Sequence, residues 1–185
     1  SVVDALRSVP SVVKATAIGG AIGLLSAASP PATGGGDSLV QHVLSGGALA
    51  IPLVALYVAL RFATGPVSYA AGTPGGLFAP LLALGALRGV LYAGTCHAIV
   101  PGIDSSVAVP MAIVGMASMF SATVRAPVTG AVLVMEMTAT TSVTVPMLAA
   151  VAGAFAVAQL MGSSPIYDSL RERMLAQLHH PPRGD

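Results

Sequence analysis

The chain has 185 residues, of which 55% are hydrophobic and only 8% are charged, with a net charge of +1. A soluble domain carries about 25% charged residues, so eight basic and seven acidic side chains are too few to cover a soluble fold of this length. The near-neutral charge also argues against a nucleic-acid partner, and the single cysteine, Cys96, excludes a disulfide framework and a cysteine metal cluster.

The positions of the charges point to a membrane protein. No Asp, Glu, Lys or Arg lies between Asp37 and Arg61, between Arg61 and Arg88, or between Glu136 and Asp168. An ionised side chain at the middle of a bilayer costs at least about 3 kcal/mol. Long uncharged runs separated by single charges therefore predict a multi-pass protein of the membrane.

The apolar runs predict an all-α bundle, because helix-length segments dominate and strand-like alternation is poor. They cover residues 11–29, 39–46, 48–61, 77–100, 107–121, 126–138 and 143–162, and a polar amphipathic tail follows over about 165–178. Several runs are shorter than the roughly 20 residues that span a bilayer, and glycine and proline interrupt them. This pattern favours broken and re-entrant helices, which transporters use to build ion sites. A tightly packed bundle with no ion pathway is the alternative.

The sequence GTPGGLFAP, residues 72–80, carries the clearest chemical signal. A glycine-rich loop leads directly into a long apolar helix, and Pro80 suits its first turn. The amides of Gly76, Leu77 and Phe78 are then expected to lack acceptors within the helix, at the positive end of its dipole. Such a helix start is an anion site. The alternative is a re-entrant turn with only a structural role.

Two further segments carry candidate polar residues. In SSPIYD, residues 163–168, Tyr167 follows a helix-starting proline, and its hydroxyl could donate to a halide. The alternative for Tyr167 is an aromatic anchor at the membrane boundary. Arg125 precedes Pro127 and leads into the helix that bears Glu136. A buried Glu136 would be a functional candidate, and a structural hydrogen bond to a neighbouring helix or to Thr138 is equally compatible with the sequence.

Taken in order, these segments resemble the CLC family of chloride channels and chloride/proton antiporters. GGLFAP at residues 75–80 is similar to the family's GxFxP element, RAPVTGAVLVMEMT at 125–138 to its RAPLTG…EMT helix, and SPIYDSL at 164–170 to its tyrosine-bearing helix. The upstream sequence from Val9 also fits, so the resemblance reaches to about Leu175. It implies that residues 1–185 form the C-terminal half of a CLC membrane domain, its second inverted repeat, ending in a polar tail from about residue 179.

The resemblance also implies a function and its site. In CLC proteins the two amides after the motif's glycine bind the central chloride, and these are Leu77 and Phe78 here. The hydroxyl of Tyr167 would point at the same ion. The helices at 126–138 and 143–162 would form a homodimer interface, and Glu136 would be a structural feature rather than a proton carrier.

Other features of the family are missing or altered. The chain has no serine loop and no GREGP-type segment with a gating glutamate, which the N-terminal half of the transporter would supply. Arg88 stands where an apolar residue is expected; it could snorkel, pair with a carboxylate, or reflect relaxed constraint. No catalytic or phosphate-binding motif is present, so no enzyme and no cofactor are expected. The sequence predicts chloride transport, as channel or antiporter and with protons as a possible second ion, in the inner membrane of a cell. A truncated, non-transporting packing partner is the alternative.

Overall fold

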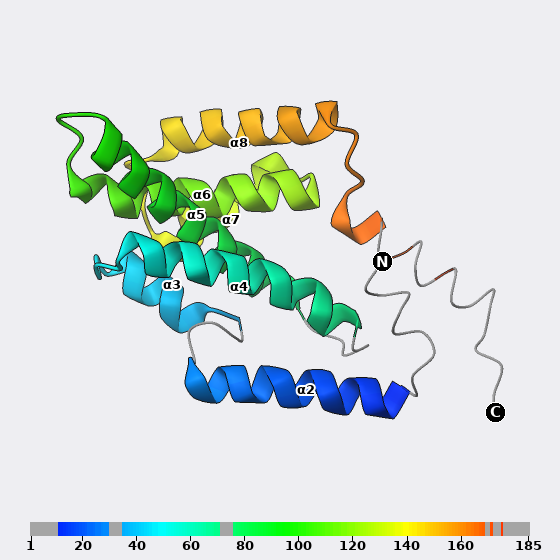
Figure 1. Cartoon of the computed structure of the whole chain (residues 1–185). Coiled ribbons are helices and arrows are strands. Elements are labelled where there is room, and N and C mark those ends of the chain that lie inside the picture. Colours follow the sequence, from blue (N-terminus) through cyan, green and yellow to red (C-terminus); the bar gives the residue numbers. More distant parts are fainter. Residues whose placement is uncertain (1–10, 30–34, 71–75, 169–170, 172–174, 176–185) are drawn as a thin grey trace. The chain divides into compact units, whose positions relative to one another are not determined.

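The computed structural model describes residues 11–29, 35–70, 76–168, 171 and 175. Within these residues the chain forms helices joined by turns, with no strand, which confirms the all-α prediction. The helices, shown in Figure 1, are α2 (Ser11–Ala28), α3 (Asp37–Leu44), α4 (Ile51–Ala70), α5 (Phe78–Ile99), the 3₁₀ turn η2 (Ser105–Val107), α6 (Ala108–Val124), α7 (Pro127–Thr138) and α8 (Thr144–Leu160). The predicted tail from residue 165 lies largely outside the described residues.

One predicted boundary is wrong. The expected run ended at Arg61, whereas α4 continues to Ala70. Arg61 is buried, with only 8% of its surface exposed, and its guanidinium lies against Gly36. A charged residue that packs against its neighbours can lie inside a helix, so Arg61 does not mark the end of α4.

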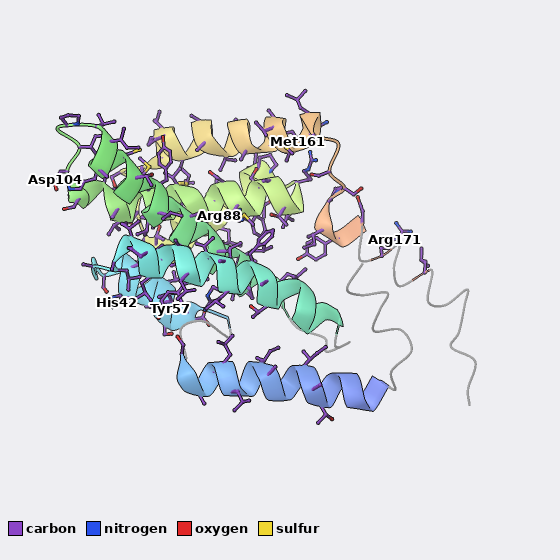
Figure 2. All side chains as sticks on the ribbon, in the orientation of Figure 1. His42, Tyr57, Arg88, Asp104, Met161 and Arg171 are labelled. Atoms are coloured by element: carbon purple, nitrogen blue, oxygen red, sulfur yellow. The ribbon has the colours of Figure 1, made fainter. Side chains whose placement is uncertain are left out.

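The chain divides into two compact units, and the first extends to Met116. In it α5 packs against both α3 and α4. The contact buries apolar side chains of all three helices: Leu39, Val43, Val54, Tyr57, Leu82 and Leu87. The buried residues of α5 lie between Leu82 and Ala93, so the helix that carries the predicted anion site is packed in its middle part (Figures 1 and 2).

Glycines bring the backbones of α5 and of the first part of α6 into direct contact within the first unit. A Cβ atom on Gly85 would lie 2.6 Å from the carbonyl oxygen of Gly115, and one on Gly89 would collide with the carbonyl of Met111. Such close approach of small residues is typical of helix packing in membranes, where apolar burial contributes little. The abundance of glycine in this sequence therefore has a packing role at this place.

The second unit begins at Ala117. In it α7 packs against α8, and Val134, Met147 and Val151 are buried. The fully buried hydroxyl of Ser121 donates to the carbonyl oxygen of Val151 at 3.3 Å, so this polar group is satisfied. Gly130 gives room to the ring of Phe120.

Two helical segments are long and apolar enough to cross a membrane, by length and composition: Phe78–Ile99 and Ser105–Val124. The segments Pro127–Thr138 and Thr144–Leu160 are apolar but shorter. The structure thus shows both long helices and the short ones that the sequence predicts. Asp104, at the turn between the two long segments, accepts a hydrogen bond from the Ser106 amide at 3.0 Å (Figure 2).

Candidate anion-binding elements

The first element is the start of α5. Leu77 is the N-cap residue, already near helical geometry (φ −79°, ψ −18°), and no side chain of the described residues caps the helix. The first intrahelical bond runs from the Leu81 amide to the Leu77 carbonyl at 3.1 Å. The amides before Leu81 cannot find acceptors within the helix, and Pro80 has no amide to satisfy. The positive end of the α5 dipole therefore lies at this point, and the anion-binding role of these amides stays a prediction. Phe78 also takes part in an interaction within the chain.

Gly76 leaves this end accessible. It is exposed, its φ lies outside the left-handed region, and a Cβ atom placed on it meets none of the described residues within 4 Å. Leu77, Phe78 and Pro80 are half-buried. The preceding loop, including Gly75 of the predicted motif, lies outside the described residues. An approaching ion would thus meet main chain at Gly76 and a packed helix beyond it.

The turn before α3 supports the first turns of α5. A Cβ atom on Gly35 would lie 3.4 Å from the Cβ of Ala79, and one on Gly36 (φ +88°) would lie 2.7 Å from Nη1 of Arg61. Asp37 interacts electrostatically with the same guanidinium. No role for Arg61 was predicted from the sequence, although a lone charge inside an apolar run was the signal that could have identified it.

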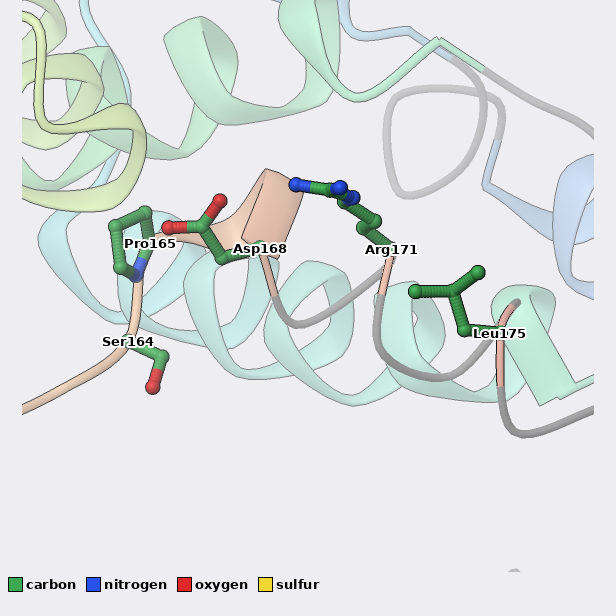
Figure 3. Close-up of a pocket in the computed structure, with 5 residues that line it drawn as sticks. All are labelled: Ser164, Pro165, Asp168, Arg171 and Leu175. Carbon is green, nitrogen blue, oxygen red and sulfur yellow. The ribbon is translucent and has the colours of Figure 1, made fainter.

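The second element is the turn at residues 166–168, in the second unit, which holds Tyr167. It follows Pro165, as expected, and the tyrosine is 55% exposed. A shallow hollow beside this turn is lined by Ser164, Pro165, Asp168, Arg171 and Leu175 (Figure 3).

Arg125 has a larger structural role than its predicted place before a helix suggests. Its backbone is left-handed (φ +64°), a conformation that costs a non-glycine residue roughly 1–2 kcal/mol. Its Nη2 donates to the carbonyl oxygens of Ala158 at 2.5 Å and Ser163 at 2.7 Å, and to the Ser163 hydroxyl at 3.3 Å. The guanidinium also lies over the ring of Phe155, 5.8 Å from its centroid. Arg125 therefore binds the C-terminal end of α8.

The other two polar candidates are on the surface of the described structure. Glu136 is exposed, and the Thr138 hydroxyl donates to the Val134 carbonyl at 2.8 Å, so the hydrogen bond considered between Thr138 and Glu136 is not formed. Arg88 is exposed on α5 and lies over the ring of Phe62, 5.6 Å from its centroid (Figure 2). This cation–π contact was not among the roles considered for Arg88.

Comparison with known proteins gives these elements a context. The family model for voltage gated chloride channels matches residues 1–159. The chain is 42% identical over 158 residues to the H(+)/Cl(-) exchange transporter ClcA of Vibrio parahaemolyticus, and 40% identical over 161 residues to that of Cronobacter sakazakii. These matches cover 85% and 87% of this chain but only 33% and 34% of the relatives. The chain thus spans about a third of the length of these curated relatives.

A solved structure agrees. The crystal structure of a slow cyanobacterial Cl−/H+ antiporter matches 97% of this chain with a TM-score of 0.84 and 33% sequence identity, and the match covers 42% of the antiporter chain. The family match takes in GGLFAP and RAPVTG, while Tyr167 lies beyond its last residue. The predicted resemblance is confirmed: the chain belongs to the voltage-gated chloride channel (CLC) family.

Proposed function

We propose that the chain forms part of a membrane transporter for chloride, and that it acts as a chloride/proton exchanger rather than as a channel. The relatives at 40–42% identity are named as exchange transporters, and the matching solved structure is of an antiporter. The observation that carries the proposal is the start of α5, where a helix with no side-chain cap follows an accessible glycine within the family's GxFxP motif.

The proposed ligand is an anion held by the main chain. A helix end contributes about 0.3–1 kcal/mol, and up to about 2 kcal/mol when partly buried. Removing an ion from water into a medium of low dielectric constant costs tens of kcal/mol. The amides of Leu77 and Phe78 therefore cannot hold a dehydrated chloride alone. By the family resemblance, the Tyr167 hydroxyl supplies a further donor and the N-terminal half of the transporter supplies the rest.

The proposed setting is the inner membrane of a cell, with the lipid bilayer on the outer surfaces of the helices. We place a homodimer contact on α7 and α8. Large apolar side chains of both helices are exposed, among them Val128, Val132, Val145 and Leu148. Chloride, with protons, is the transported species, and the proposal includes no cofactor.

Flux measurements test the proposal. Full-length protein is reconstituted into chloride-loaded liposomes, and chloride and proton movements are recorded with and without a pH gradient. We expect chloride efflux to drive proton uptake, and a pH gradient alone to drive chloride movement. Chloride flux with no proton movement would identify a channel, and no chloride flux would contradict transport altogether.

A second candidate function is a non-transporting membrane segment that serves as a packing or assembly partner. The observation in its favour is that the chain covers only about a third of its relatives. The 185-residue chain alone separates the two candidates. We expect it to move no chloride in liposomes and to gain flux when the N-terminal half of a relative is supplied. If the two halves together remain inactive, the packing-partner function is favoured.

A further inference from the structure

The arginine at the end of α6 is held in a conformation that its own helix does not require. Its amide donates to the Ser121 carbonyl at 3.0 Å and closes the last turn of α6, a role that any residue fills. The left-handed backbone at this position favours glycine, because glycine has no Cβ atom. An arginine here is strained unless its side chain makes interactions that glycine cannot make.

The side chain of Arg125 makes such interactions, all of them within the second unit. One nitrogen, Nη2, joins the Ala158 carbonyl in the last turn of α8 to the carbonyl and hydroxyl oxygens of Ser163 beyond its end. A cation at this place also complements the negative end of the α8 dipole. Nε of Arg125 is buried and has no hydrogen-bond partner among the described residues, whereas the residue as a whole is half-buried.

These contacts fix the segment that leads to Tyr167. Between α8 and the turn at residues 166–168 the chain passes through Gly162 (φ +63°) and two exposed serines. Glycine restrains a backbone weakly, and apart from Arg125 the Ser163 side chain has one bond to α8, from its hydroxyl to the Ala158 carbonyl at 3.3 Å. The bonds to Arg125 tie down Ser163, which lies four positions before Tyr167.

We propose that Arg125 is the positioning residue of the Tyr167 segment. It sets where the tyrosine hydroxyl lies by joining the end of α8 to Ser163. This inference rests on the proposed function, because it assigns a role in anion binding to a residue that need not touch the ion.

Two substitutions separate the effect of the Arg125 side chain from the effect of its left-handed backbone. Arg125→Gly suits the left-handed conformation and removes the guanidinium, so the fold need not be lost with the contact. Arg125→Lys keeps the charge but offers a single donor nitrogen in place of a planar fork. Arg88→Gln is the matched control, since it removes an exposed arginine that also lies over an aromatic ring.

The first measurement is local mobility and does not depend on transport. In full-length protein with Cys96→Ser, and with any cysteine outside this chain also replaced, a spin label is attached at Asp168→Cys or, as a control, at Leu24→Cys, an exposed position of α2. We expect Arg125→Gly to increase the mobility of the label at position 168 and not at 24, with Arg125→Lys intermediate and Arg88→Gln without effect. No change at position 168 would overturn the inference.

The second measurement is halide affinity, by calorimetry on the unlabelled protein. We expect Arg125→Gly and Tyr167→Phe each to weaken binding about tenfold, the loss expected for one hydrogen bond to a charged ligand. The double variant should be no weaker than either, since both act on one donor. If Tyr167→Phe weakens binding and Arg125→Gly does not, the positioning role is wrong. If neither has an effect while the label at 168 is mobilised, it is the proposed role of Tyr167 that fails.

Discussion

Gly76 is the residue at which the anion proposal is most directly tested. Its φ suits alanine, and a methyl group there meets no described atom, so Gly76→Ala should leave the free energy of unfolding unchanged or raise it by up to about 1 kcal/mol. The same methyl group would cover the main chain that an ion approaches. We expect halide affinity to fall at least about tenfold, a loss of about 1.4 kcal/mol, in calorimetry on the full-length protein.

Gly153→Ala is the control for this variant. Gly153 lies in α8, and an added Cβ atom there also meets none of the described residues within 4 Å. Alanine there should stabilise the helix slightly and leave halide affinity unchanged. Equal affinity in both variants and the unchanged protein would mean that no ion approaches Gly76.

Asp104 gives a prediction about pH. The hydrogen bond from the Ser106 amide, helped by the Ser105 hydroxyl and by the nearby His97, holds the pKa of Asp104 below its ordinary value. A lowered folded-state pKa means that the carboxylate stabilises the turn above the unfolded-state pKa. This stabilisation is lost as the pH falls through the folded-state pKa.

Hydrogen exchange of the Ser106 amide measures this effect. After correction for intrinsic exchange, its protection should drop in acid, and Asp104→Asn should remove the drop because asparagine accepts a hydrogen bond but does not titrate there. The Val100 amide, bonded to the Cys96 carbonyl at 2.8 Å, should show no drop in the same range. A drop that persists in Asp104→Asn would assign the titration to another group.

The residues of the candidate site were not equally predictable from sequence. The helix start after Gly76 and Leu77 was predictable, because the geometry of a helix start depends on a few neighbouring residues, whereas the anion-binding role of these residues stays a prediction. The contacts of Arg125 were not predictable, since its partners Ala158 and Ser163 are distant in the sequence and use main-chain oxygens, which have no sequence signature. The packing of Arg61 against Gly36 was not predictable either, because these two residues are also distant in the sequence.

At the scale of elements, the glycine contact between α5 and α6 predicts that the effect of a glycine-to-alanine substitution on stability depends strongly on its position. Gly89→Ala would push a methyl group into the backbone of Met111, and neither helix can move without disturbing its other neighbours. Overpacking of this kind costs about 1–3 kcal/mol. Thermal unfolding in detergent should show that loss. Gly23→Ala, in α2, where an added Cβ atom meets no described atom within 4 Å, should instead be neutral or stabilising by up to about 1 kcal/mol. Equal effects would mean that the two backbones are not in contact.

Most helix boundaries were predictable to within a few residues, because proline and glycine mark them in this sequence. Pro127 begins α7, and the left-handed Gly162 follows the end of α8. The end of α4 was not predictable, because Gly65 and Pro66 lie inside the helix instead of ending it. Local propensity was overridden there, as in many membrane helices, where an unbroken backbone is strongly favoured.

At the scale of the whole molecule, an exposed apolar side chain can face lipid, a second copy or the N-terminal half of the transporter, and composition does not tell the second copy from the other two. Cross-linking does, because a disulfide forms only when two Cα atoms approach within about 7 Å. In full-length protein with Cys96→Ser and any other native cysteine replaced, single cysteines would be placed at exposed positions of α7 and α8: Val128, Val132, Val145, Leu148, Val157 and Leu160. We expect oxidation in liposomes to give covalent dimers at some of these positions.

The identity of the positions that cross-link shows where the dimer interface lies, and not only that a dimer exists. Around a two-fold axis only residues near the axis meet their own copies, so the reactive positions should lie together on one face of α7 or α8. A cysteine at Leu24 of α2, which is also exposed, should stay monomeric. Cross-linking at Leu24 and at none of the six positions would move the interface to α2. Equal, weak cross-linking everywhere would indicate collisions of monomers whose exposed side chains face lipid.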